Sequence, residues 1–324
     1  LQFDETRIFR IKPNCEPDIN EMGYRGLTFD RENENDIRRV LFLGDSFIMG
    51  HNVEMDETIA AAVSRRLGAG YEVLNLGVLA YGPDQSLVGL IEDGLDLNPD
   101  MVILGIFAAN DFQDLDHNGI FSVDEGGRLA QNDQNVVTER TPGLQTLFMF
   151  YRLQAYLQPR VDPRHRFLSR RYEFMMNQIV YDTYDWDLLY FPESEKSREK
   201  IDLMRAVLMR FKEELNSKEI IFSVVNIPSY QNIVDPSEFE GKGIGSEHRE
   251  EFEEAKENDF FGPEDIVVEL CEDLEIPILN LYPEFIELDG EERFSLYDED
   301  DWHLSVVGNR FSGDLVATEL VRPL

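Results

Sequence analysis

Short apolar runs alternate with stretches of helical spacing along the first part of the chain. The runs at 38–44, 71–77 and 100–108 predict buried strands, and the spacing of apolar residues at 56–70 and 82–100 predicts helices. Strands and helices that alternate at this spacing favour right-handed crossover connections. The pattern therefore predicts a parallel sheet whose two faces are both buried by helices.

The alternation stops between residues 112 and 194 and then resumes. A polar loop rich in Asn, Asp and Gly, followed by an aromatic and Arg-rich stretch, indicates a large insertion there. Beyond it the pattern predicts a helix at 195–217, a strand at 218–228, an acidic linker at 235–262, a helix at 263–274, a strand at 276–282 and a helix at 305–320. We therefore predict one α/β domain over 38–320 with five parallel strands, preceded by an N-terminal extension over 1–37.

Small or polar residues follow each of the first three predicted strands. Ser46 follows the first strand in "GDSF", Gly77 follows the second in "NLGVLAYG", and Asn110 follows the third in "AAND". In an open parallel sheet, ligands bind beyond the carboxyl ends of the strands. A hydroxyl at the end of a hydrophobic strand adds nothing to packing, so we interpret Ser46 as placed there for access to a ligand.

A further polar run, "DEDDWHLS", precedes the last predicted helix and contains Asp300 and His303. A serine hydroxyl becomes a useful nucleophile when a histidine accepts its proton, and a carboxylate orients that histidine. Asp300 lies three residues before His303, so one turn can bring the two together. The backbone N–H groups of Ser46 and Gly77 and the side-chain amide of Asn110 are the candidate donors to a developing oxyanion.

These blocks together resemble the SGNH hydrolases, also called the GDSL family. The four blocks stand in order as "GDSF" at 44–47, "NLGVLAYG" at 75–82, "AAND" at 108–111 and "DDWH" at 300–303, with Ala108 where the family usually has glycine. The resemblance implies a flavodoxin-like three-layer α/β/α sandwich, no cofactor and no metal, and hydrolysis or transfer of acyl groups. The "NEMGYRG" run at 20–26 resembles bacterial members.

Several neighbouring residues have simpler interpretations. We assign Asp45 and Asp111 to hydrogen bonding within turns, and His51 to a solvated helix face rather than to the cleft. Asp301 competes with Asp300 as the orienting acid, and the D-x-x-H spacing of the family favours Asp300. The aromatic stretch at 147–191 fits the core of the insertion better than a lid over an acyl group.

Composition narrows the choice of partners. The 324-residue chain has 65 acidic and 30 basic residues and a formal net charge of −35, which disfavours nucleic acid and anionic membrane surfaces as partners. No run of 18 apolar residues is present, so no span of a bilayer is expected. Whether Cys15 and Cys271 pair is left open. The start at Leu1 suggests a trimmed N-terminus and favours an extracytoplasmic location, periplasmic or secreted, without fixing it.

The sequence thus predicts a serine-dependent ester hydrolase acting on small-molecule or carbohydrate esters. An O-acetyltransferase acting on an extracytoplasmic polysaccharide would need the same triad, and a non-catalytic binding module on the same fold would need none of it. The acyl chain length, the alcohol partner and the oligomeric state stay open.

Overall fold

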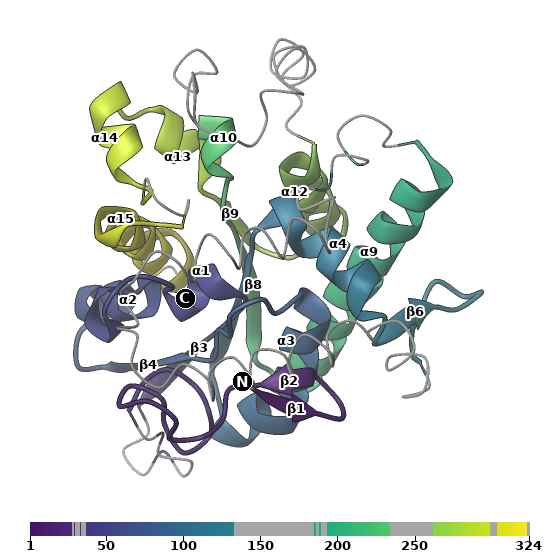
Figure 1. Cartoon of the computed structure of the whole chain (residues 1–324), viewed down its shortest axis with the longest axis horizontal. Helices are drawn as coiled ribbons and strands as arrows, with labels where there is room; N and C mark the ends of the chain where they lie inside the picture. Colours follow the sequence, from purple (N-terminus) through teal and green to yellow (C-terminus); the bar gives the residue numbers. More distant parts are fainter. Residues whose placement is uncertain are drawn as a thin grey trace, which may run out of the picture.

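The computed structural model describes residues 1–27, 29, 33, 37–132, 185, 188, 193–233, 262–298 and 303–322. At its centre five parallel strands pair in the order β4-β3-β5-β8-β9 (Figure 1). Their bounds are β3 Arg38–Leu43, β4 Tyr71–Asn75, β5 Met101–Ile106, β8 Ile221–Asn226 and β9 Ile278–Asn280. All five predicted strands are confirmed, and the first strand lies between the second and the third, as in a flavodoxin-like sheet.

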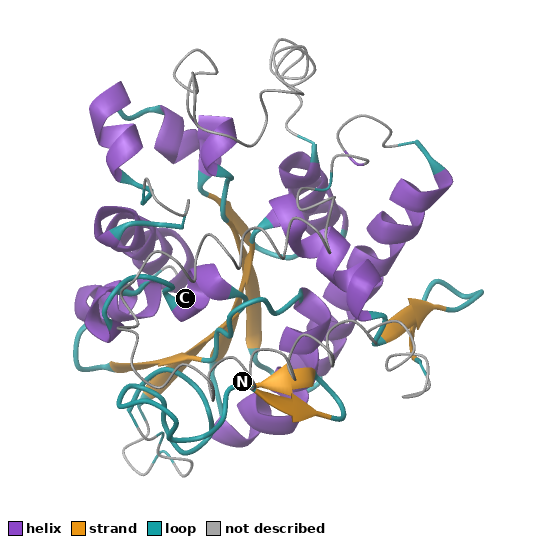
Figure 2. Ribbon diagram, in the orientation of Figure 1, coloured by secondary structure: helices purple, strands orange, loops and turns teal. Residues whose placement is uncertain are grey.

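The strands are buried on both faces, and their side chains alternate between two apolar clusters. Val40 and Phe42 belong to the cluster that includes α2 and α15, whereas Leu41 and Leu43 belong to the cluster on the opposite face. Helices lie on both sides of the sheet (Figure 1; Figure 2). On one side are α2 (Ile59–Leu67) and α15 (Val306–Leu315), and on the other are α3 (Pro83–Gly89), α4 (Ala108–Asn118), α9 (Glu195–Asn216) and α12 (Pro263–Asp273). The predicted three-layer sandwich is confirmed.

Several predicted helices are broken into shorter turns. The stretch at 82–100 forms α3, followed by a π-helical turn, η2 (Leu90–Gly94), and a 3₁₀ turn, η3 (Leu95–Leu97). Helix α15 likewise continues as a π-helical turn, η5 (Val316–Val321). The sequence did not predict the small elements, which are β1 Gln2–Asp4, β2 Ile8–Arg10, α1 Ser46–Met49, η1 Met55–Glu57, β6 Phe121–Val123, β7 Leu129–Gln131, α10 Tyr230–Ile233, α13 Tyr282–Ile286 and α14 Gly290–Ser295.

The predicted insertion at 112–194 begins inside α4, which continues to Asn118, and goes on into the β6–β7 hairpin. Most of its aromatic and Arg-rich part lies outside the described residues. Asp185 is described, and it is fully buried: its carboxylate accepts hydrogen bonds from Lys200 Nζ at 2.7 Å and from the Gln113 amide at 3.0 Å. The insertion therefore returns to the core against α4 and α9.

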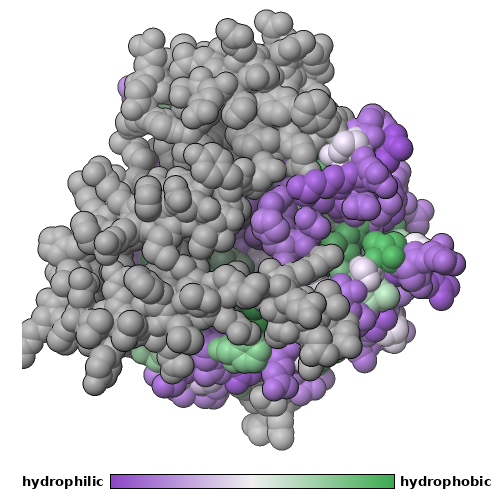
Figure 3. Space-filling model, turned by 45° about the vertical axis from the view of Figure 1, so that its right-hand side comes forward, coloured by the Kyte–Doolittle hydropathy of each residue, from purple (hydrophilic) through white to green (hydrophobic). Residues whose placement is uncertain are grey.

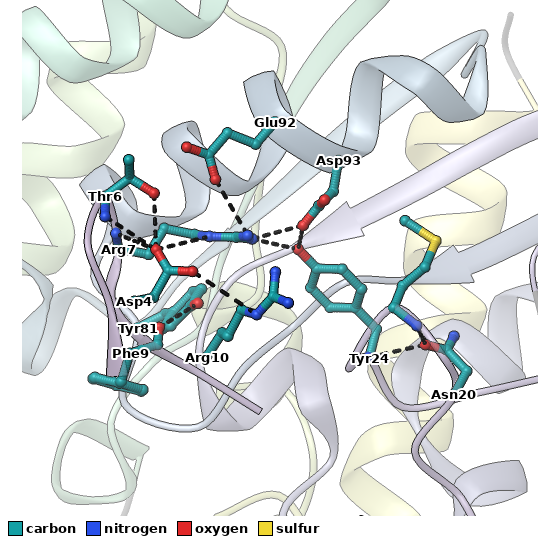
Figure 4. A network of polar contacts seen from close by, with 11 residues as sticks. Asp4, Thr6, Arg7, Phe9, Arg10, Asn20, Tyr24, Tyr81, Glu92 and Asp93 are labelled. Atoms are coloured by element: carbon teal, nitrogen blue, oxygen red, sulfur yellow. Dashed lines mark hydrogen bonds and ion pairs between the residues drawn. The ribbon is translucent and has the colours of Figure 1, made fainter. Parts of the chain in front are cut away.

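The N-terminal extension packs on the domain. Its β1–β2 hairpin contributes Ile8 and Phe9 to the apolar cluster. Arg7, only 2% exposed, places its guanidinium 2.7 Å from Asp93 and 3.2 Å from Glu92, both on η2 (Figure 4). A buried cation is tolerated only when anions and hydrogen bonds satisfy it, so this cluster fixes where the extension docks.

The described surface is mostly hydrophilic on the side that Figure 3 shows, as the acidic composition requires. Both cysteines are free, Cys15 exposed and Cys271 buried. Within the described part of the chain, no helix has the length and apolar character needed to cross a membrane.

Helices α2 and α15 touch through a glycine. A Cβ added at Gly313 would lie 2.4 Å from Ala62 Cβ and 2.8 Å from the Ile59 carbonyl oxygen. The two helices can approach this closely only because position 313 has no side chain.

We predict that Gly313→Ala destabilises the protein, by about 1–3 kcal/mol for an overpacked contact. The sign of the change in the free energy of unfolding tests the contact, because glycine-to-alanine exchange inside a helix ordinarily stabilises the helix by about 1 kcal/mol. Gly290→Ala is the control, since a Cβ there would meet nothing within 4 Å. Urea unfolding measures both, and a Gly313→Ala protein as stable as the Gly290→Ala control would contradict the contact.

Candidate active site

Ser46 is the first residue of α1, directly beyond the carboxyl end of β3. Gly44 makes the bend with φ of +148°, and a Cβ there would lie 2.7 Å from Ile48 Cγ1 and 2.9 Å from the Gly105 carbonyl oxygen. Asp45 then caps the helix, accepting a hydrogen bond from the Phe47 amide at 2.9 Å. As the first residue of a helix, Ser46 has an N–H group with no acceptor inside the helix.

His303 stands at the end of a paired turn. Tyr297 and Leu304 form an antiparallel bridge, and the Asp298 amide donates to the His303 carbonyl oxygen at 2.8 Å. The imidazole packs against two residues from α1 and the turn after it: its centroid lies 4.9 Å from the rings of both Phe47 and His51. The backbone pairing and the ring contacts together hold the histidine in front of α1.

The structure brings Ser46 and His303 together. Ser46 Oγ lies 2.8 Å from His303 Nε2, although the two residues are 257 positions apart in the chain. This is hydrogen-bond distance for a hydroxyl that gives its proton to an imidazole. The arrangement can activate a serine, provided that the other ring nitrogen carries the proton.

The predicted orienting acid, Asp300, lies outside the described residues, and so does its competitor Asp301. The described ends of their loop, Asp298 and His303, are joined by the backbone hydrogen bond given above. Asp300 as the orienting carboxylate therefore stays a prediction.

Gly77 is engaged differently from what the sequence suggested. Its N–H donates to Asn75 Oδ1 at 2.9 Å, while Asn75 Nδ2 donates to the Ile48 carbonyl oxygen at 2.7 Å. A Cβ at position 77 would lie 2.4 Å from the Met49 nitrogen. In this structure Gly77 therefore serves the close packing of its loop on α1, and its amide already has an acceptor.

Asn110 lies in the first turn of α4, beyond the end of β5. Its backbone N–H donates to the Phe107 carbonyl oxygen at 3.2 Å, and its side-chain Oδ1 is buried with no hydrogen-bond partner among the described residues. A buried polar atom that the fold leaves unsatisfied is costly, and such atoms concentrate at functional sites. The Oδ1 atom is thus not used to hold the described fold together.

Acidic side chains lie close behind the serine. Asp45 caps α1, and Asp111 accepts a hydrogen bond from the Phe107 amide at 2.8 Å, which confirms their predicted use in turns. Burial raises the pKa of Asp45 to about 6, although the Phe47 amide and the nearby His303 lower it. Burial, followed by the charges of Asp45 and Asp114, raises the pKa of Asp111 well above its usual value.

Two residues at the site were not assigned a site role from sequence. His51 packs edge-on against His303, so its predicted place on a solvated helix face is wrong. Asn75 links the loop of Gly77 to α1. Its position in the second block was a usable signal, whereas nothing in the sequence connects position 51 with position 303.

Among the residues that the structure describes, no group of three or more His, Cys, Asp or Glu side chains is arranged to hold a metal ion.

No model of a known protein family matches the chain, and no curated protein matches it. Solved structures do match. A lipase/acylhydrolase from Enterococcus faecalis is 15% identical, with 88% of this chain and 95% of that chain covered and a TM-score of 0.44. A carbohydrate acetylesterase from Sinorhizobium meliloti is 15% identical, with 89% and 100% covered and a TM-score of 0.43. An acetyl xylan esterase is 13% identical, with 87% and 100% covered and a TM-score of 0.46.

The flavodoxin-like sandwich predicted from the sequence is confirmed by the strand order β4-β3-β5-β8-β9 itself. Fold alone does not determine the reaction, which has to be argued from the site.

Asp84 gives the stability of the protein a defined pH dependence. This residue of α3 is 1% exposed, and its Oδ1 accepts from the Gln85 amide at 2.9 Å and from Asn118 Nδ2 at 3.0 Å. Burial raises its pKa to about 7, although these hydrogen bonds lower it. The folded protein therefore holds a proton that the unfolded chain releases near pH 4, and stability falls as pH rises from about 4 to 7.

We predict that Asp84→Asn removes the fall in stability with rising pH that Asp84 causes. The free energy of unfolding of the variant minus that of wild type should therefore increase by a few kcal/mol between pH 4 and pH 8. Asp124→Asn is the control. The amides of Arg128 and Gly126 lower the pKa of Asp124, so it is ionised in both states above pH 5 and its difference from wild type should stay flat. Urea unfolding at pH 5, 6, 7 and 8 measures both. Parallel curves for wild type and Asp84→Asn would refute the assignment.

Proposed function

We propose that this chain is a serine-dependent ester hydrolase of the SGNH type. One observation carries the proposal: Ser46 Oγ and His303 Nε2 meet at 2.8 Å at the carboxyl end of the parallel sheet. A binding module has no physical need for this pair, since a serine next to a histidine base is the arrangement that nucleophilic catalysis requires.

In the proposed reaction Ser46 Oγ attacks the ester carbonyl carbon while its proton passes to His303 Nε2. The new Oγ–C bond gives a tetrahedral intermediate, which collapses as the bond to the alcohol oxygen breaks and His303 gives its proton to that oxygen. Water then attacks the acyl-enzyme carbonyl carbon, and its proton goes to His303. The Oγ–C bond breaks as His303 returns that proton to Ser46 Oγ, which releases the acid. Asp300 is proposed to hold the proton on the other ring nitrogen of His303.

The oxyanion needs fixed donors, and loss of one typically costs about 2.7–4 kcal/mol. We assign this role to the Ser46 N–H at the start of α1 and to the side-chain Nδ2 of Asn110, which lies at the start of α4 beyond the end of β5. Gly77 can be a third donor only if its N–H leaves Asn75 Oδ1. The first two donors come from neighbouring strands, β3 and β5, which hold them in a fixed relation.

The substrates proposed are small-molecule or carbohydrate esters. The net charge of −35 disfavours anionic esters through long-range repulsion, so neutral acyl groups on neutral alcohols fit best. Transfer of the acyl group to a sugar hydroxyl would use the same acyl-enzyme, with the hydroxyl in place of water.

We predict that Ser46→Ala lowers kcat on p-nitrophenyl acetate at least about 10³-fold, because the covalent intermediate cannot form. Ser86→Ala is the control: Ser86 is 1% exposed, and its Oγ has no partner in the described structure. Release of p-nitrophenol from acetyl and longer esters measures both and gives the chain-length preference. Equal rates for Ser46→Ala and wild type would exclude Ser46 as the nucleophile. A folded wild type that acts only when a sugar acceptor is supplied would identify transfer instead.

Asp300→Asn should lower kcat by about 10⁴-fold, since an amide in place of the orienting carboxylate favours the wrong histidine tautomer. Asp301→Asn changes the same charge one position away and should leave kcat within a small factor of wild type. Both are measured with the same ester across pH 6 to 9. The reverse ranking would assign the orienting role to Asp301.

A further inference from the structure

The "NEMGYRG" run at 20–26 forms a tight turn in the N-terminal extension, and we call it the Asn20 turn. Asn20 Oδ1 accepts hydrogen bonds from the Met22 amide at 3.0 Å and the Tyr24 amide at 3.1 Å. Gly23 has φ of +85°, and a Cβ there would lie 2.4 Å from the Ile11 carbonyl oxygen. The turn therefore needs both Asn20 and Gly23, and it sets the directions of the side chains that follow.

Tyr24 ties the turn to the body of the domain. It is 3% exposed, and its hydroxyl donates to Asp93 Oδ2 at 2.7 Å and accepts from Arg7 Nη1 at 2.9 Å (Figure 4). Arg7 is itself paired with Asp93 at 2.7 Å. The turn is thus anchored on η2 independently of the candidate active site.

Arg25, the next residue, reaches in another direction, to the end of the serine helix. Its Nη1 donates to the Gly50 carbonyl oxygen at 2.5 Å and lies 3.4 Å from that of Met49, and its Nη2 donates to the Val53 carbonyl oxygen at 2.7 Å. Its Nε donates to Asp18 Oδ2 at 2.8 Å, and its side chain is 11% exposed. One guanidinium therefore satisfies several carbonyl groups where α1 ends.

One of the residues whose carbonyl group Arg25 binds, Gly50, also makes a hydrogen bond to Ser46. The backbone amides of Gly50 and His51 both donate to the Ser46 carbonyl oxygen at 3.0 Å. Gly50 therefore links Arg25, which binds its carbonyl group, to Ser46, which accepts from its amide. Helix α1 has four residues, too few to be stable without outside partners. A cation at its carboxyl end also interacts favourably with the exposed carbonyl dipoles.

The same turn carries the ring that packs against the histidine. His51 follows Gly50, and its imidazole centroid lies 4.9 Å from that of His303 at an angle of 64°. Arg25 thus holds the segment from which both partners of the 2.8 Å hydrogen bond are positioned: Ser46 through the backbone and His303 through His51.

We propose that Arg25 is a positioning residue of the active site, by which the N-terminal extension sets the geometry of Ser46 and His303. This rests on the proposed function for its kinetic consequence, but not for its structural one. Arg25 touches no reacting atom and acts through the carbonyl groups at the end of α1.

The test compares Arg25→Ala and Arg25→Lys with Arg10→Ala. Arg10 lies in the same extension, with its side chain 35% exposed and its Nε 3.8 Å from Asp4 Oδ2, and within the described structure it makes no hydrogen bond or ion pair to α1. We expect Arg25→Ala to lower kcat on p-nitrophenyl acetate by about 10- to 100-fold with KM within about twofold, because misplacement of a nucleophile acts on the chemical step. Arg25→Lys keeps the positive charge but loses the planar guanidinium, which can donate to several carbonyl oxygens at once. Its kcat should therefore lie between those of Arg25→Ala and wild type.

A second readout does not depend on turnover. Amide hydrogen exchange of the peptide that covers residues 44–53 should be faster in Arg25→Ala than in wild type, and unchanged in Arg10→Ala. Wild-type kcat and wild-type exchange in Arg25→Ala would overturn the proposal, as would a loss of activity of the same size in Arg10→Ala. If wild type hydrolyses no ester, the proposed function fails, and exchange at 44–53 alone decides whether Arg25 holds the serine helix.

Discussion

The close approach of α1 to the sheet is the constraint on which the rest of the site depends. Ile48 lies over Gly44 and Gly105, where an added Cβ would come within 2.7 Å and 2.4 Å of its side chain, and Gly77 lets the next loop reach the Met49 nitrogen. A Cβ at Gly44 or Gly105 would clash with the Ile48 side chain, and a Cβ at Gly77 would clash with the helix backbone. The backbone of the serine is thereby fixed by packing, and its hydroxyl lies 2.8 Å from His303 Nε2 and 3.5 Å from Asp45 Oδ2.

Charge is distributed unevenly between the surface and the site. Most acidic residues are solvated, but Asp45, Asp84 and Asp111 are at most 4% exposed. Each has a raised pKa, which means that burial opposes their ionisation more than their hydrogen bonds favour it. These three buried carboxyl groups therefore lower the stability of the fold as pH rises through neutrality.

The strands and the identity of the serine and histidine could be predicted from sequence because both leave local signals. A parallel strand buried on both faces is a continuous apolar run, as in "VLFL", and ligand sites follow the ends of such strands. The hydrogen-bond partner of Gly77 could not be predicted in this way. Its place after a strand was visible, but the competing acceptor, Asn75 Oδ1, depends on how the loop folds back on α1. The contacts of Arg25 with α1 and of His51 with His303 are long-range and leave no periodic signal.

The separation of Ser46 and His303 along the chain determines when during synthesis the two residues can first meet. Because His303 comes 257 positions after Ser46, a ribosome must add 257 residues beyond the serine before the pair can meet. The contact of α15 with α2, at Gly313 and Ala62, is completed even later. A chain made only as far as β5 contains Ser46 but not His303, so the hydrogen bond between them cannot form in it. The proposed nucleophile therefore gains its histidine partner only after all five strands of the central sheet have been synthesised.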